Sequence, residues 1–70
     1  MKRIATQTAT KGKKSVTLDM YSNDNMITYA DTKENYYKIV HEPNLEKARN
    51  LFFEWTLKMH NIHTELSLYN

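Results

Sequence analysis

The 70-residue sequence contains no cysteine, a single glycine and a single proline. The absence of cysteine excludes disulfides, thiolate zinc sites and cysteine nucleophiles, and it suits a reducing compartment such as the cytoplasm. One glycine is too few for the glycine-rich loops that hold nucleotide phosphates. No run of about 18 apolar residues occurs, which argues against a membrane-spanning helix. We therefore expect a cytoplasmic protein that does not bind nucleotides through such a loop.

The length and composition are those of one small globular domain. Seventy residues are close to the lower limit for a single hydrophobic core, and 40% of them are apolar against 26% charged. The chain begins with methionine, and its basic first residues run into threonines instead of the apolar stretch of a signal peptide. We expect a complete protein of one domain, residues 1–70. Self-association remains open because the core is small.

Four stretches before residue 43 predict β-strands. The alternation is clearest in residues 15–21, where Val16, Leu18 and Met20 point to one side of a strand. Residues 2–10, 26–31 and 36–42 alternate less strictly, and polar turns separate the four stretches. We place the first strand at a sheet edge, because neither of its faces is strongly apolar. A spacing of about ten residues per strand and turn predicts an antiparallel meander.

The largest apolar stripe lies between Asn44 and Tyr69. Its members recur every three or four residues, as they would along one side of an α-helix. They are Leu45, Ala48, Phe52, Trp55, Met59, Ile62, Leu66 and Tyr69. Pro43 ends the preceding strand, Asn44 is a favoured N-cap, and no later glycine or proline interrupts the stripe. The predicted fold is therefore α+β (ββββα), an antiparallel meander of three or four strands packed on one long C-terminal helix.

A continuous helix to Tyr69 would be longer than the sheet. It would extend about 40 Å at 1.5 Å per residue, whereas the strands would cover about 20 Å. The apolar residues at its end would then be exposed, and such a group usually marks a binding surface. This candidate protein-binding set is Ile62, Leu66, Leu68 and Tyr69. The same surface could form a homodimer; the alternative is that the residues after Asn61 fold back and complete the core.

The basic residues gather near the N-terminus. The first fourteen residues hold five positive charges and no acid: Lys2, Arg3, Lys11, Lys13 and Lys14. A basic hairpin can lie along a phosphate backbone, so these five residues form a candidate nucleic-acid-binding set. Lysines at hairpin tips also prevent edge-to-edge pairing of sheets. This role explains the lysines as well as nucleic-acid binding does. Bases could stack on Tyr21, Tyr29 or Tyr36 if these point away from the helix.

Residues for catalysis or metal binding show no recognised pattern. His60 and His63 lie three apart, with His41, Glu42 and Glu65 as further ligand candidates, but the pattern of two histidines four apart with an intervening glutamate is absent. No nucleophile is paired with a histidine and an orienting acid. We therefore predict no metal, no cofactor and no enzymatic activity.

The best interpretation is a small non-enzymatic protein that binds another protein. Its size, its lack of cysteine and its many Asn, Lys and Tyr residues are typical of phage and mobile-element products. By this analogy, the hypothesis is an inhibitor or adaptor that occupies a surface of a host complex such as a defence nuclease. The alternative is a DNA- or RNA-binding regulator that uses the basic hairpin, and only this alternative predicts binding that weakens steeply with salt.

Overall fold

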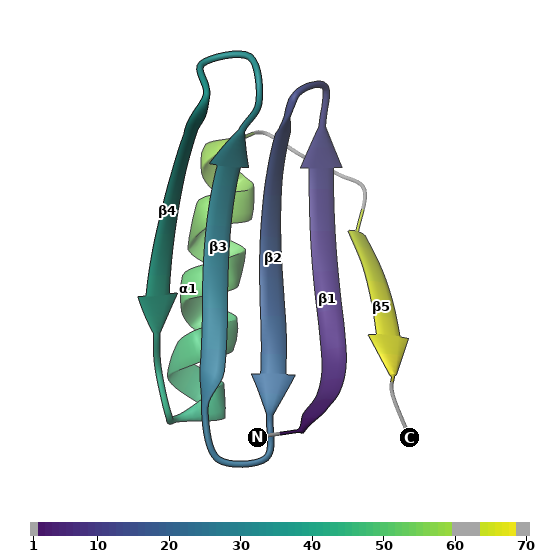
Figure 1. The fold of residues 1–70 in the computed structure, drawn as a ribbon, viewed down its shortest axis with the longest axis vertical. Helices are drawn as coiled ribbons and strands as arrows, with labels where there is room; N and C mark the ends of the chain where they lie inside the picture. Colours follow the sequence, from purple (N-terminus) through teal and green to yellow (C-terminus); the bar gives the residue numbers. More distant parts are fainter. Residues whose placement is uncertain (1, 60–63, 69–70) are drawn as a thin grey trace.

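A computed structural model describes residues 2–59 and 64–68 (Figure 1). The elements are β1 (Arg3–Lys11), β2 (Lys14–Tyr21), β3 (Asn25–Asp31), β4 (Tyr36–His41), α1 (Leu45–Lys58) and β5 (Thr64–Leu68). The strands form one sheet in the order β4-β3-β2-β1-β5, and every neighbouring pair is antiparallel. Helix α1 packs on one face, against β2 and β3. The predicted α+β fold, with four meander strands followed by a helix, is confirmed.

The core lies between α1 and the sheet face that it covers. The alternation in β2 has the expected effect, since Val16 and Leu18 are fully buried and Ile27 of β3 is buried beside them. From the helix, four members of the apolar stripe close the core: Ala48, Phe52, Trp55 and Met59. Leu45, also in the stripe, remains 39% exposed.

The connection from β4 to α1 is held by two asparagines. Asn44 is the N-cap, and its side-chain oxygen accepts a hydrogen bond of 3.0 Å from the backbone N–H of Lys47. Asn25 is buried at the start of β3, and its Nδ2 donates to the carbonyl oxygens of Glu42 and Pro43 at 2.9 and 3.3 Å. The sheet thereby fixes the point at which the helix begins.

The prediction of one helix reaching Tyr69 is wrong. Helix α1 ends at Lys58, and Thr64–Leu68 form β5, which pairs with β1. The prediction that β1 lies at a sheet edge is wrong for the same reason, because β5 occupies that edge. A strand there satisfies backbone groups of β1 that an overhanging helix would leave without partners. Residues 65–68 also alternate polar and apolar side chains, but the three-four spacing of the helical stripe conceals this shorter period.

Helix α1 itself is too short and too polar to cross a membrane, and no other helix occurs in residues 2–59 and 64–68.

Candidate functional site

Turns far apart in the sequence meet at one end of the sheet. Strands β1 and β3 run toward this end and β2 and β4 run away from it, so the β1–β2 and β3–β4 turns lie together (Figure 1). Helix α1 runs antiparallel to β4 and therefore finishes at the same end. The two turns and the last turn of α1 bring together Lys11, Lys13, Lys14, Lys33 and Lys58. We call these five residues the lysine end.

The lysine end surrounds a hollow of about 610 Å³. The other residues that line this hollow are Gly12, Asp31, Glu34 and Met59. Five lysines and two carboxylates give it a formal charge of +3. The remaining charged residues of the chain are five basic and six acidic, a balance of −1. The small net charge of the protein therefore conceals one strongly positive end, which can attract an anionic partner.

Hydrogen bonds hold the two lysine-bearing turns together. The carbonyl oxygen of Lys13 accepts both the backbone N–H of Thr32, at 2.9 Å, and its hydroxyl, at 3.1 Å. One carboxylate oxygen of Asp31 accepts the backbone N–H groups of Lys33 and Glu34 at 3.1 and 3.2 Å. Asp31 thus stabilises the turn through two local side-chain hydrogen bonds. Hydrogen bonds within the protein therefore hold the backbone of the two turns that carry Lys13 and Lys33.

Gly12 makes the first of these turns tight. It has a φ of +60° at the first of the two residues between β1 and β2, as in a type II′ turn. A Cβ at this position would meet no atom within 4 Å, so glycine is needed for its backbone conformation and not for space. The turn therefore leaves Lys11 and Lys14 paired across the hairpin and projects Lys13 at its tip.

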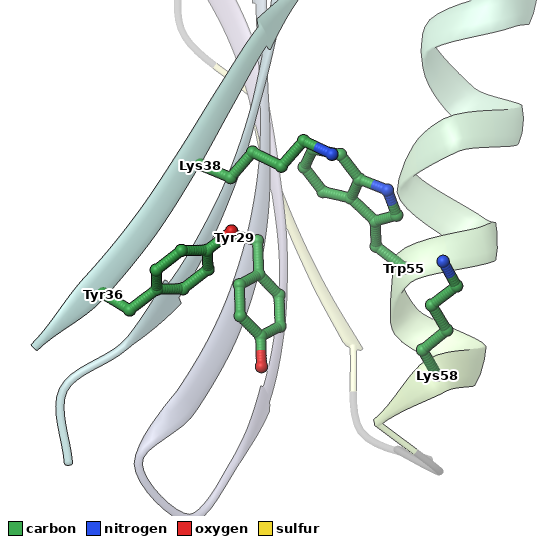
Figure 2. Close-up of a pocket in the computed structure, with 5 residues that line it drawn as sticks. All are labelled: Tyr29, Tyr36, Lys38, Trp55 and Lys58. Atoms are coloured by element: carbon green, nitrogen blue, oxygen red, sulfur yellow. The ribbon is translucent and has the colours of Figure 1, made fainter. Parts of the chain in front are cut away.

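A second, smaller hollow of about 210 Å³ lies between β4 and α1, and we call it the aromatic slot. Its lining residues are Tyr29, Tyr36, Lys38, Trp55 and Lys58 (Figure 2). Lys38 reaches from β4 toward the helix, and its Nζ lies 5.5 Å from the centre of the Trp55 ring, within range of a cation–π interaction. The Tyr29 and Tyr36 rings meet edge to face, with centroids 6.1 Å apart. Lys58 lines both the slot and the lysine end, so the two hollows adjoin.

The structure separates the residues of the predicted basic hairpin. Lys11, Lys13 and Lys14 lie at the lysine end, whereas Lys2 and Arg3 lie at the other end of β1, about 25 Å away at the usual rise per strand residue. Arg3 lies 3.4 Å from the carboxylate of Asp19. The five residues therefore lie at two ends of the hairpin, and only the three lysines of the turn belong to the lysine end.

Two of the three tyrosines considered for base stacking share one face of the sheet. Tyr29 and Tyr36 lie on the face that α1 covers, as the registers of Tyr29 with Val16 and of Tyr36 with Asp31 require. Base stacking on the open face of the sheet required that these tyrosines point away from the helix, and Tyr29 and Tyr36 do not meet that condition. Tyr37, the next residue of β4, is on the opposite face and 68% exposed.

Two of the four residues in the predicted protein-binding set belong to the strand at the edge of the sheet opposite β4. Leu66 and Leu68 belong to β5, where they are the register partners of Gln7 and Ala5, while Ile62 and Tyr69 are outside the described residues. The reason given for exposing these four residues, a helix longer than the sheet, no longer applies because α1 ends at Lys58.

No group of three metal-ligating side chains occurs within residues 2–59 and 64–68. His41 instead lies 3.1 Å from the carboxylate of Asp24. His60 and His63 are outside the described residues.

Sequence reasoning missed the contributions of Lys33, Lys38, Trp55 and Lys58 to these two hollows. The sequence contained a signal for Lys33 and Lys58. In a meander the first and third turns lie at the same end of the sheet. A helix that follows the fourth strand runs back toward that end. Lys33 lies in the third turn and Lys58 at the helix end. Finding Lys58 required knowing that the helix ends there.

The chain was compared with protein-family models, curated proteins and solved structures, and none of them matches it.

Proposed function

We propose that the protein is a non-catalytic nucleic-acid-binding protein, and that the lysine end holds the phosphate backbone. The observation that carries this proposal is the convergence of five lysines from three separate segments on one hollow. Lysine is a common point-charge ligand for phosphate, and neutralised phosphates release counterions that drive binding. The bonds from Thr32 to the carbonyl of Lys13 support it further, because a fixed backbone loses less entropy when the ligand binds.

Fluorescence anisotropy with labelled DNA and RNA tests the proposal. Five phosphate contacts give a log–log salt slope of about −4.5 on duplex DNA, so affinity should fall about 500-fold between about 50 and 200 mM salt. The double variant Lys13→Ala/Lys33→Ala removes two contacts and should make the slope shallower by about two. The matched control is Lys2→Ala/Lys47→Ala, which removes the same charge at the opposite end of the molecule.

The control variant should keep the wild-type slope. If both double variants weaken binding equally, net charge and not the lysine end controls affinity. If the wild-type protein binds no nucleic acid at about 50 mM salt, the proposed function is refuted.

A second candidate is an inhibitor or adaptor that docks on another protein through β4. This strand is an outer strand of the sheet, and Tyr37 and Ile39 are 68% and 43% exposed on the face opposite α1. An exposed strand edge can pair with a strand of a partner. Affinity capture distinguishes the candidates: a protein partner should be lost with Ile39→Lys and retained with the Lys13→Ala/Lys33→Ala variant. The candidate fails if Ile39→Lys captures the same proteins as the wild type.

A further inference from the structure

We infer that the aromatic slot receives an unpaired nucleobase, so that the protein prefers single-stranded nucleic acid; this inference rests on the proposed binding of phosphates at the lysine end. The slot joins three aromatic side chains to two ammonium groups, and the hollow beside it is lined by four further lysines. A nucleic-acid strand carries planar bases next to charged phosphates. It therefore matches the aromatic rings of the slot and the adjoining lysines.

Aromatic side chains line the slot from both the sheet and the helix. Tyr29 and Tyr36 approach from the sheet and Trp55 from the helix, and the space between them stays open (Figure 2). Its volume of about 210 Å³ is smaller than the pockets that take drug-sized molecules, and it suits a single planar ring system. Aromatic side chains stack on every base, because each base has a π-face.

The charges of the slot exclude the other common ligand of an aromatic cluster. Aromatic cages often bind quaternary ammonium groups. Here Lys38 already places its ammonium at the Trp55 ring, and Lys58 lines the same space, so a second cation would be repelled. Both ammonium groups can instead donate hydrogen bonds to the carbonyl oxygens and ring nitrogens of a base.

Lys58 gives the two hollows a common wall. A base in the aromatic slot would have its own phosphate beside Lys58, and the next phosphates would follow the hollow toward Lys33 and Lys13. A paired duplex cannot place a base in the slot unless the base leaves its stack, which costs free energy. The lysine end therefore accounts for phosphate binding, and the slot accounts for a preference for single strands.

The test uses Trp55, the only tryptophan of the chain, as a fluorescent reporter. The probes are an oligothymidylate, an abasic strand of equal length with the same phosphates, a duplex and a nucleoside triphosphate. The oligothymidylate should quench Trp55 and bind about tenfold more tightly than the abasic strand. Tyr36 is 53% exposed, so Tyr36→Ala should fold, and it should remove this tenfold preference without changing duplex affinity.

Two variants serve as controls for Tyr36→Ala. Tyr37→Ala removes the neighbouring tyrosine from the opposite face and should leave both the quenching and the affinity unchanged. Tyr36→Phe keeps the ring and should behave as the wild type. If Tyr37→Ala reduces single-strand binding as much as Tyr36→Ala does, the slot is not the base site.

The outcomes separate this inference from the proposed function. Equal binding of the abasic strand and the oligothymidylate, without quenching, overturns the slot assignment but leaves phosphate binding intact. Absence of binding to every strand refutes the proposed function, and the inference falls with it. If the triphosphate quenches Trp55 and binds as tightly as the strand, the slot is a free-nucleotide site and the single-strand assignment is wrong.

Discussion

Replacing Asn25 by alanine should destabilise the protein substantially, although the sequence places this residue in a polar turn. Asn25 is 3% exposed, and its Nδ2 donates to the carbonyl oxygens of Glu42, at 2.9 Å, and Pro43, at 3.3 Å. The substitution removes both donors from the segment that leads into α1. Its effect therefore reaches the packing of the helix on the sheet.

The expected loss in the free energy of unfolding depends on which of the two carbonyl groups can form a hydrogen bond with water instead. Pro43 is exposed, so its carbonyl can exchange the lost bond for a water molecule, whereas Glu42 is partly buried. An unsatisfied buried acceptor costs about 1–3 kcal/mol, and we expect Asn25→Ala to lower the free energy of unfolding by about 2 kcal/mol. In a domain of this size, that corresponds to a fall in Tm of about 8–16 °C.

Urea denaturation followed by circular dichroism measures this loss. Asn50→Ala is the matched control, because Asn50 is exposed on α1 and alanine is a better helix former there. Asn25→Asp replaces the donor by a third acceptor facing two carbonyls and should be at least as destabilising as Asn25→Ala. If Asn25→Ala changes the free energy of unfolding by less than about 0.5 kcal/mol, as surface substitutions do, the bonds of Asn25 do not hold the β4–α1 connection.

Three further predictions concern other parts of the fold and use the same denaturation assay. Leu18→Ala should lower the free energy of unfolding by about 2–5 kcal/mol, because Leu18 is fully buried. Leu57→Ala should lower it much less, because Leu57 is 56% exposed. Similar losses for the two variants would contradict the assigned core. Asn44→Ala should cost about 1 kcal/mol by removing the N-cap bond, and a stability equal to the wild type would show that this bond is not needed. Gly12→Ala should cost about 1 kcal/mol for its positive φ, and Gly12→Asn should cost less; the reverse order would argue against the left-handed turn.

The elements governed by local patterns could be predicted from the sequence. Strict alternation around Val16 and Leu18 predicts the central strand, and the structure buries both residues. The three-four spacing of Ala48, Phe52 and Trp55 predicts the helix and the side that it turns to the sheet. These patterns suffice because each depends on the period of one element and on the removal of its apolar side from water.

The C-terminal strand β5 could not be predicted from a local pattern. Leu66 fits the three-four spacing of the helix as well as the alternation of a strand, so local periodicity allows both structures. The choice depends on β1, whose free edge offers backbone partners to Thr64–Leu68. Pairing with a strand more than fifty residues away in the sequence is a tertiary interaction, and the pattern of a single element does not contain it.

The sequence by itself determined the four meander strands, the helix that covers them and the lysines at the first turn. Only the tertiary structure decided that Lys58 joins Lys13 and Lys33, that Lys2 and Arg3 do not, and that Tyr36 and Trp55 line the same hollow. The physical reason is that secondary structure follows from interactions between near neighbours in the chain, whereas the site consists of side chains from separate turns and from the helix. Antiparallel strand order and the packing of α1 bring those segments to one end of the molecule.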